Sequence, residues 1–516
     1  MSGALSRRTL LEGAAVSAVA GGSVVTNARA ASAKGTDSAV DWASFDNVVG
    51  SAFKQMQNVG GAVAVVSAGA VLHTATFGSR TLQGRKPVTV NTRFAVGSTT
   101  KAMTAALVAT YVDQQRLGWD QKVVDAWSGF RAPTEGITRG LRVRDLLGMA
   151  SGLGEPTTIQ SELHFDSLTA PQLLQSVVNL PVVAPRVNEK WVYNNTVQAV
   201  GGYLPFLAAG VPAGDLEAAY ATAMQERIFG PAGMTGVRIG SDPRGLVDEY
   251  AEGYGFDLRP RATMLPFAPI GAWAPAGAAW ASVTDMAAWV RLQLRQGRSV
   301  TGRRVVSAAD LIECWKPHVT APLIYGAANP DVQTSGYAMG WFSDEYKDGS
   351  RLVWHAGGFD GFTTYMAFLP EHDLGLVVLS NINPGPTGSL WNLFVLDQLL
   401  SDRFGLNGSG RGTTLTNAAA ALAALAVLGR QATTVDLKAV EPYLGYYEGG
   451  WSMVREGREL LLRIGPRTIP LLVMPDGTFV MAGGPNVGAR IRLARESDGT
   501  PHVELPGVET VRRTTG

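Results

Sequence analysis

The sequence has a single cysteine, Cys314, among 516 residues, and this scarcity excludes several kinds of site. One cysteine cannot form an internal disulfide, and zinc sites or iron–sulfur clusters that need several cysteines are excluded as well. Charged residues make up only 17% of the chain, below the average of about 25%, while hydrophobic residues make up 46%. This composition excludes an intrinsically disordered chain, which would be poor in hydrophobic residues and rich in charge.

The chain also lacks an excess of charge of either sign. Lys and Arg total 44 against 43 Asp and Glu, which leaves a formal net charge of +1, and no Lys/Arg-rich run is found. Without a basic patch to attract phosphates, we expect no nucleic-acid partner. Glycine, in contrast, is abundant with 61 residues, which predicts many tight turns or close backbone contacts.

The N-terminus has the features of an export signal in the usual order. Ser6-Arg7-Arg8 precedes a weakly apolar stretch rich in alanine and glycine, and Ala28-Arg29-Ala30 fits the A-x-A cleavage pattern. Paired arginines before such a stretch resemble a twin-arginine signal. We therefore expect residues 1–30 to be removed and the mature protein to be secreted or to lie in the cell envelope, without stable membrane insertion. The alternative is a disordered N-terminal tail.

The rest of the chain divides into three predicted parts. Residues 31–405 have strand patterns at both ends of a long helical region, which predicts an α/β domain: an antiparallel sheet flanked by helices, with a large all-helical insert. Residues 406–438 are interpreted as a linker with a short helix that Asn417 caps, about 11 apolar residues long and too short to span a bilayer. Residues 439–516 alternate in short runs between turns, which predicts a small antiparallel β-barrel-like domain.

The candidate nucleophile is Ser98, which is followed three residues later by Lys101. Residues three apart lie on one face of a helix, about 5 to 6 Å from each other. Lysine accepts the serine proton only when it is neutral, and both burial and the positive end of a helix lower its pKa. A helix start also offers the backbone N–H of Ser98 to an oxyanion.

Ser-x-x-Lys alone is a weak signal, because Ser51 and Lys54 match it too. We interpret that second copy as an exposed helix face, since polar residues follow it. Tyr193-Asn194-Asn195 and His355-Ala356-Gly357 are single matches to Tyr-x-Asn and His-x-Gly, and they follow Ser98 in that order. Alone, the Tyr-x-Asn match is compatible with a tyrosine in the core, and the His-x-Gly match with a histidine in a turn. The three motifs in this order are far more specific.

With these motifs the chain resembles the serine β-lactamase and penicillin-binding protein superfamily, in the branch of class C β-lactamases, D,D-carboxypeptidases, D-aminopeptidases and related esterases. The resemblance covers about residues 45 to 405. It implies that Ser98 forms an acyl-enzyme and that Lys101 and Tyr193 move the proton to and from it. It implies neither a metal nor an organic cofactor.

The resemblance also implies roles in substrate binding. Asn195 would orient a substrate amide, Gly357 would let its strand approach the substrate, and Gly358 would offer a second oxyanion N–H. His355 departs from the lysine of most β-lactamases and, with an ordinary pKa near 6.5, favours peptidase, amidase or esterase chemistry. It also predicts that acidification improves the use of carboxylate-bearing substrates. We find no glutamate in a convincing position for the deacylation water of class A enzymes.

Two further features admit alternative interpretations. Tyr443-x-Gly445-x-Tyr447 is similar to the start of lipocalin-like domains. Such domains are appended to D-aminopeptidases, other hydrolases of the family and peptide-cyclising thioesterases of penicillin-binding type. A barrel with a purely structural role is an equally good interpretation. Trp191, Trp273 and Trp280 are candidates for an apolar acyl pocket or for core packing.

The sequence thus predicts an exported serine hydrolase that acts on amide, peptide or ester bonds. Its expected partner is a small-molecule or peptide substrate with D-amino acids beside the scissile bond. The alternatives within the fold are a β-lactamase, a D,D-carboxypeptidase or an acyltransferase. A catalytically idle protein that binds peptidoglycan or another ligand is the alternative outside enzymes, but it would have no need for Ser98, Lys101 and Tyr193 together.

Overall fold

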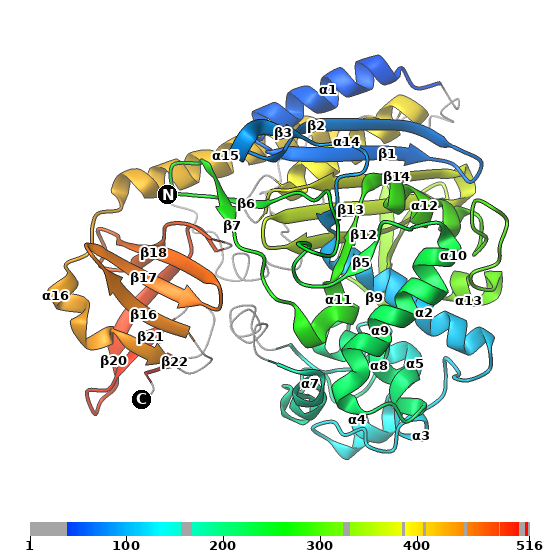
Figure 1. Cartoon of the computed structure of the whole chain (residues 1–516), viewed down its shortest axis with the longest axis horizontal. Coiled ribbons are helices and arrows are strands. Elements are labelled where there is room, and N and C mark those ends of the chain that lie inside the picture. The colour runs from blue at the N-terminus through cyan, green and yellow to red at the C-terminus, as the bar shows by residue number, and fades with distance from the viewer. Residues whose placement is uncertain are drawn as a thin grey trace.

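The computed structural model describes residues 39–155, 168–323, 331–383, 388–405, 409–447, 451–484, 486–504 and 511–513. The predicted signal, residues 1–30, lies outside them. Two bodies are visible in Figure 1: a large one built on a central sheet and a smaller one made of strands at the C-terminal end of the chain.

A nine-stranded sheet forms the centre of the large body, in the order β3-β2-β1-β14-β13-β12-β11-β10-β9 (Figure 1). Neighbouring strands pair antiparallel throughout, which confirms the predicted sheet. The strands are β1 (Gly60–Val66), β2 (Val71–Thr81), β3 (Lys86–Pro87), β9 (Val319–Thr320), β10 (Val332–Tyr337), β11 (Phe342–Tyr346), β12 (Arg351–Phe359), β13 (Phe362–Leu369) and β14 (Leu374–Ser380).

Helices cover both faces of this sheet, and the alternation of side chains along its central strands explains how. Val63 and Val65 of β1 pack in a cluster with α1 (Trp42–Gln55) and α14 (Gly388–Phe404), whereas Ala62 and Ala64 join the cluster of α12 (Val283–Leu294) on the other face. Because both faces are buried, β1 and β14 are apolar along nearly their whole length.

The helical region between β4 and β5 lies below the sheet in Figure 1. Its elements are α2 (Thr100–Asp113), α3 (Val123–Ala126), α4 (Glu135–Gly140), α5 (Val143–Leu147), α7 (Ala170–Ser176), α8 (Asn195–Ala208), α9 (Leu216–Ala223) and α10 (Gly230–Ala232). Short strands and helices complete the body: β4 (Phe94–Ala95), β5 (Arg238–Ile239), β6 (Gly253–Phe256), β7 (Ala262–Leu265), α11 (Ala274–Gly277), β8 (Ala279–Ala281) and α13 (Ala308–Glu313). α2 is at the centre, with every residue from Thr100 to Tyr111 buried, so this part of the helix has no face toward solvent.

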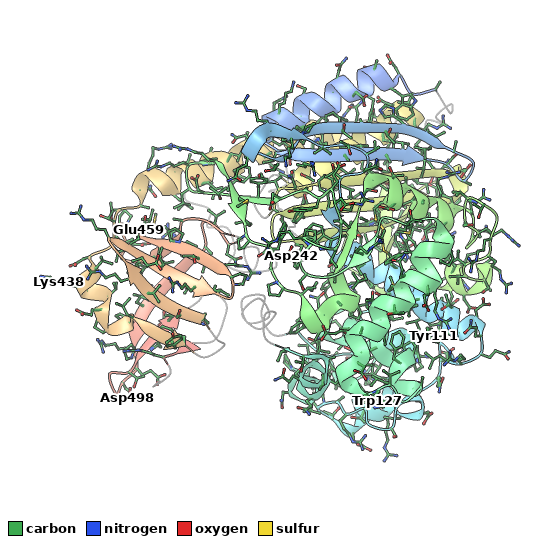
Figure 2. The ribbon with its side chains drawn as sticks, viewed as in Figure 1. Tyr111, Trp127, Asp242, Lys438, Glu459 and Asp498 are labelled. Atoms are coloured by element: carbon green, nitrogen blue, oxygen red, sulfur yellow. The ribbon has the colours of Figure 1, made fainter. Side chains whose placement is uncertain are left out.

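The C-terminal body is an eight-stranded antiparallel sheet with its strands in chain order, and it bears out the predicted small β-domain. The strands are β15 (Gly445–Tyr447), β16 (Trp451–Glu456), β17 (Glu459–Ile464), β18 (Arg467–Val473), β19 (Phe479–Met481), β20 (Arg490–Arg495), β21 (Pro501–Glu504) and β22 (Val511–Arg512). The sheet curls, and a bridge between Tyr447 and Arg513 joins its first strand to the residue after its last. Figure 2 shows the charged side chains Lys438, Glu459 and Asp498 on its outside.

The helix between the two bodies is longer than the sequence predicts. α15 runs from Ser409 to Gln431, so Asn417 lies inside the helix and does not cap it. Its residues 411–431 are long and apolar enough for a membrane span by length and composition, with 22% of the apolar window buried. Leu422 and Leu425 pack against the β6–β7 hairpin and the β-domain in one apolar cluster, so α15 contacts both bodies. The short helix α16 (Leu437–Val440) follows.

A buried ion pair also joins the two bodies. Arg467 on β18 contacts Asp360 in the turn between β12 and β13, and their side chains are only 4% and 11% exposed. This turn directly follows the strand that carries the His-x-Gly motif, so the β-domain is anchored beside the region that the motifs predict to be functional.

Candidate active site

Ser98 lies in a single 3-10 turn, Gly97–Thr99, that leads from β4 into α2. Gly97 has a φ of +53°, and a Cβ there would lie 2.8 Å from the carbonyl oxygen of Gly358. Only glycine tolerates both conditions without strain. Gly97 therefore allows the chain to turn sharply, present Ser98 at the start of α2 and touch strand β12 at the same time.

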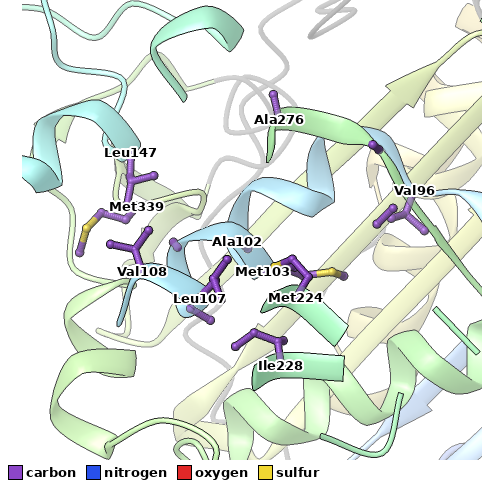
Figure 3. Packing of buried hydrophobic residues seen from close by; sticks show 14 of the residues in the cluster. Val96, Ala102, Met103, Leu107, Val108, Leu147, Met224, Ile228, Ala276 and Met339 are labelled. Atoms are coloured by element: carbon purple, nitrogen blue, oxygen red, sulfur yellow. The ribbon is translucent and has the colours of Figure 1, made fainter. Parts of the chain in front are cut away.

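Lys101 is fully buried, and its amine contacts the hydroxyl of Ser98 as the spacing predicts. Its Nζ lies 2.9 Å from Ser98 Oγ and 2.9 Å from the carbonyl oxygen of Ala276, which accepts a hydrogen bond from it. The surroundings are apolar: Figure 3 shows Ala102, Met103 and Ala276 among the packed side chains of this core. Burial lowers the Lys101 pKa to about 7, against an opposing electrostatic effect of Glu155. A large share of the lysine is therefore neutral near pH 7 and able to accept a proton.

Tyr193 approaches Ser98 from the segment that precedes α8. Its hydroxyl donates a hydrogen bond of 2.8 Å to Ser98 Oγ, and its ring lies 4.8 Å from Lys101 Nζ. Burial raises the Tyr193 pKa well above its ordinary value, although the bond to Ser98 opposes this. The phenol is thus protonated at neutral pH, so Lys101 is the better base in the free protein, and Tyr193 is placed to relay a proton.

Asn195 is the first residue of α8 and is held by a glutamate that sequence reasoning missed. The backbone N–H of Asn195 donates to Glu155 Oε1 at 2.9 Å, and its side-chain Nδ2 donates to Glu155 Oε2 at 3.0 Å. Burial raises the Glu155 pKa to about 7, while the bonds to Asn195 and the nearby Lys101 oppose the rise. None of the three motifs marks Glu155, which lies 40 residues before Asn195 in the chain.

His355 is buried beneath the site, with 2% exposure, and is not at its surface. Its Nδ1 lies 2.6 Å from the carbonyl oxygen of Ala356, which can only accept, so Nδ1 carries the proton and Nε2 accepts from the Tyr337 hydroxyl at 3.0 Å. Burial and the nearby Lys101 lower the His355 pKa to about 3. The expected gain for carboxylate-bearing substrates on acidification is therefore wrong, because this ring stays neutral between about pH 5 and 8.

Strand β12 has one open side where the motif lies. Residues 351–354 of β12 pair with β11. Among the described residues, 355–359 pair with β13 alone, so the edge of this segment that faces away from β13, toward the site, has no neighbouring strand. A Cβ on Gly357 would lie 2.0 Å from the carbonyl oxygen of Val96 and 2.2 Å from Thr364 Oγ1. Gly357 is therefore required for packing against the turn before Ser98, and its role in the approach of a substrate stays a prediction. Gly358 lies directly against Gly97, close to the nucleophile.

The three tryptophans considered for an acyl pocket have different positions. Trp273 and Trp280 are core residues, 4% and 1% exposed, and their indole N–H groups bond to Thr196 Oγ1 and to the carbonyl oxygen of Gly240. Trp191 is partly exposed, and its ring centroid lies 6.2 Å from that of Tyr193. Only Trp191 of the three is therefore available to line a pocket.

The second Ser-x-x-Lys match, Ser51 and Lys54, is neither buried nor close to the other motifs. Ser51 and Lys54 are exposed on α1, and Ser51 Oγ accepts a hydrogen bond from Gln55 Nε2 one turn further on, as expected for an external helix face. In the parts of the chain that the structure describes, no group of three or more His, Cys, Asp or Glu side chains is placed to hold a metal ion.

Comparison with known proteins supports the assignment that the motifs suggest. A family model described as Beta-lactamase matches residues 45–400. The chain is 27% identical over 304 residues to Unguisins hydrolase ungD' of Aspergillus campestris, covering 57% of this chain and 53% of that protein. It is 26% identical to Unguisins hydrolase ungD of Aspergillus violaceofuscus, covering 71% and 65%, so it spans less than two thirds of either hydrolase.

Penicillin-binding protein 4* of Bacillus subtilis is 25% identical, over 62% of this chain and 68% of that protein. Among solved structures, the octameric penicillin-binding protein homologue from Pyrococcus abyssi superposes with a TM-score of 0.59 over 92% of this chain and 100% of that one, at 18% identity, which shows a shared fold. Since the family model covers well over half of the sequence, the chain belongs to the beta-lactamase family, whose members are generally serine hydrolases.

Proposed function

We propose that this protein is an exported serine hydrolase that cleaves amide, peptide or ester bonds through an acyl-enzyme on Ser98, with D-configured residues beside the scissile bond as the preferred substrates. The observation that carries the proposal is the convergence of Lys101 Nζ and Tyr193 OH on Ser98 Oγ, at 2.9 and 2.8 Å. Curated relatives named as hydrolases support the reaction class.

The proposed reaction has two stages that use the same groups. In the first, Ser98 gives its proton to neutral Lys101 while Oγ bonds to the substrate carbonyl carbon, and the backbone N–H groups of Ser98 and Gly358 bind the oxyanion. The bond to the leaving amine or alcohol then breaks, and that group receives the proton through Tyr193. In the second stage, water gives a proton to Lys101 and attacks the acyl-enzyme ester. The bond from the acyl carbon to Ser98 Oγ then breaks, and Lys101 returns its proton to Ser98 Oγ, which releases the acid and restores the free enzyme.

The regions outside the hydrolase body have proposed roles as well. Residues 1–30 would direct export by a twin-arginine route, which fits the paired arginines and the A-x-A pattern. Residues 439–516 would form a lipocalin-like domain, supported by its curled antiparallel sheet and the Tyr-x-Gly-x-Tyr start. Its buried ion pair and apolar contacts with the hydrolase support a mainly structural role.

Acyl-enzyme trapping tests the proposed function. Residues 31–516 would be incubated with a D-amino-acid amide, a nitrophenyl ester, a thioester and a β-lactam, and the acylated residue located by mass spectrometry. We expect an adduct on Ser98 that Ser98→Ala abolishes and that Ser51→Ala, the matched control in the competing motif, leaves unchanged. Turnover that persists in Ser98→Ala would refute the proposal, and amide products formed when amines are added would identify an acyltransferase.

A further inference from the structure

Residues 272–279, which include α11, form a segment that contacts both α2 and α8 beside the site. Its start is attached to α8, because the Tyr203 hydroxyl donates to the carbonyl oxygen of Ala272 at 2.8 Å. Its middle supplies the carbonyl oxygen of Ala276, which accepts from Lys101 Nζ at 2.9 Å. The surroundings of the Lys101 amine therefore depend on how this segment is held.

Thr104 of α2 holds the middle of this segment. It stands three residues after Lys101, on the same face of the helix. Its Oγ1 lies 2.7 Å from the carbonyl oxygen of Pro275, 2.8 Å from the Tyr220 hydroxyl and 3.2 Å from the carbonyl oxygen of Thr100. Carbonyl oxygens can only accept, so the single Thr104 hydrogen points to the nearer one, at Pro275, and Tyr220 donates to Thr104. The Thr104 and Tyr220 side chains are fully buried, so solvent does not compete for these bonds.

Packing keeps Thr104 and Pro275 together. A Cβ on Gly202 of α8 would lie 2.4 Å from Pro275 Cβ and 2.8 Å from Thr104 Cγ2, so glycine at this position allows α8 to close over the contact. The peptide group that joins Pro275 to Ala276 is planar, so a bond to the Pro275 carbonyl also restrains the start of Ala276. Thr104 thus acts on the residue whose carbonyl oxygen contacts Lys101.

The Ala276 carbonyl oxygen determines which way the neutral Lys101 amine faces. A neutral amine has two N–H groups and one lone pair, and an oxygen that can only accept must meet an N–H. The lone pair is then left for the hydrogen of Ser98, whose Oγ lies 2.9 Å from Nζ. Displacement of the carbonyl would let the amine turn and would remove an acceptor from its protonated form.

We propose that Thr104 is a positioning residue: its hydroxyl holds the Pro275–Ala276 peptide so that the Ala276 carbonyl aims the Lys101 amine at Ser98. The inference rests on the proposed function, because it takes Lys101 as the base that deprotonates Ser98. It extends the machinery of the site beyond the three motifs, to a buried threonine that acts through residues 272–279 and not on the substrate.

Three substitutions separate the hydroxyl of Thr104 from its bulk. Thr104→Val removes the hydroxyl and keeps the size of the side chain, whereas Thr104→Ser removes the methyl group and keeps the hydroxyl. Thr104→Ala removes both, and it provides a second hydroxyl-free protein in case valine opposite the Pro275 carbonyl prevents folding. Thr110→Val is the matched control, since Thr110 is a buried threonine of the same helix whose hydroxyl donates to the carbonyl oxygen of Leu107 at 2.7 Å.

Two measurements on the full mature chain report on Lys101. Mass spectrometry of quenched samples would give the rate at which a nitrophenyl ester acylates Ser98 at each pH. NMR of protein labelled with ¹³C at lysine Cε would give the titration midpoint of Lys101, whose signal is assigned by its absence in Lys101→Met. The titratable groups around the amine, Glu155, Tyr193 and His355, are the same in every variant, so differences report its hydrogen bonds.

We expect acylation to be about tenfold to 10²-fold slower in Thr104→Val and Thr104→Ala, because Ser98 and its base are misaligned. The Lys101 midpoint should fall by about one pH unit, since the protonated lysine loses a charge-assisted hydrogen bond. Thr104→Ser and Thr110→Val should both match wild type. These results together would support positioning by Thr104, because a loss of packing alone would affect Thr104→Ser and Thr110→Val as well.

An unchanged or raised midpoint in the hydroxyl-free variants would overturn the inference, and so would an unchanged rate where wild type is acylated. A serine variant that behaves like the hydroxyl-free ones, or a control that shifts equally, would also overturn it. Failure of the proposed function looks different, because wild type itself would then show no acylation of Ser98. The titration would still decide whether Thr104 positions the lysine, since it requires no substrate.

Discussion

Replacement of Lys101 by methionine tests whether this lysine is held as a weak base. The side chain is fully buried, and burial lowers its pKa from 10.5 to about 7. A group whose pKa is lower in the folded protein binds fewer protons there than in the unfolded chain, so stability should rise with pH between about 7 and 10.5. Lys101→Met removes this dependence and replaces the amine with an apolar group of similar length.

The expected magnitude follows from the two pKa values. The change from 10.5 to about 7 corresponds to about 5 kcal/mol of destabilisation at pH 6, where the buried lysine must carry its charge. At pH 9 the lysine is neutral in the folded protein, and its deprotonation costs only about 2 kcal/mol. The stability difference between variant and wild type should therefore shift by about 3 kcal/mol in favour of the wild type between these values. Loss of the lysine should also raise the Glu155 pKa, which acts in the same direction.

The assay is urea denaturation of both proteins at pH 6 and pH 9, followed by tryptophan fluorescence. The bonds that Lys101 makes to Ser98 and Ala276 are lost at both pH values, so their contribution cancels in the comparison. Acylation of Ser98 should fall by about 10² to 10⁴-fold in the variant, as for loss of a general base. An equal stability difference at both pH values would refute a lowered Lys101 pKa, whatever the effect on activity.

Three further outcomes follow from the structure. Tyr193→Phe removes the hydroxyl that contacts the nucleophile, so burst-phase kinetics should show acylation about 10²-fold slower with unchanged circular dichroism. Gly357→Ala places a Cβ 2.0 Å from a backbone oxygen and should lower the free energy of unfolding by about 3 kcal/mol, whereas Gly136→Ala, with open space around it, should be neutral or slightly stabilising. Asp360→Asn removes the carboxylate that pairs with buried Arg467, so calorimetry should show the β-domain unfolding at a lower temperature than in wild type.

Much of the fold could be predicted because it depends on local patterns. At the start of α12, for example, Ser282 and Asp285 stand three residues apart and form a capping box, a pattern that is local in the sequence. The length of α15 was underestimated, because its first turns contain glycine, serine and threonine, which are typical of a linker. In the structure, Arg411 forms a hydrogen bond with Gln398 of α14, and the two helices pack together. Packing of this kind overrides local propensity.

The positions of the candidate nucleophile and base were predictable from their spacing, but the protonation states around them were not. Ser98 and Lys101 lie one turn apart on a single helix, so the sequence contains their geometry. The pKa of His355 depends on burial under Tyr337 and on Lys101, which are distant in the chain. Glu155 escaped notice for the same reason, because its partner Asn195 lies 40 residues further on.

Neutrality of His355 bears on how the site works as a whole. A lysine at this position would place a second cation near Lys101, and like charges oppose each other's protonation. With histidine, the positive charge of this buried cluster resides on Lys101 and is balanced electrostatically by Glu155. The cluster can therefore gain and lose a proton near neutral pH without a fixed cation from β12 to attract a substrate carboxylate. Recognition would then depend on hydrogen bonds such as those of Asn195, which suits uncharged amides and peptides.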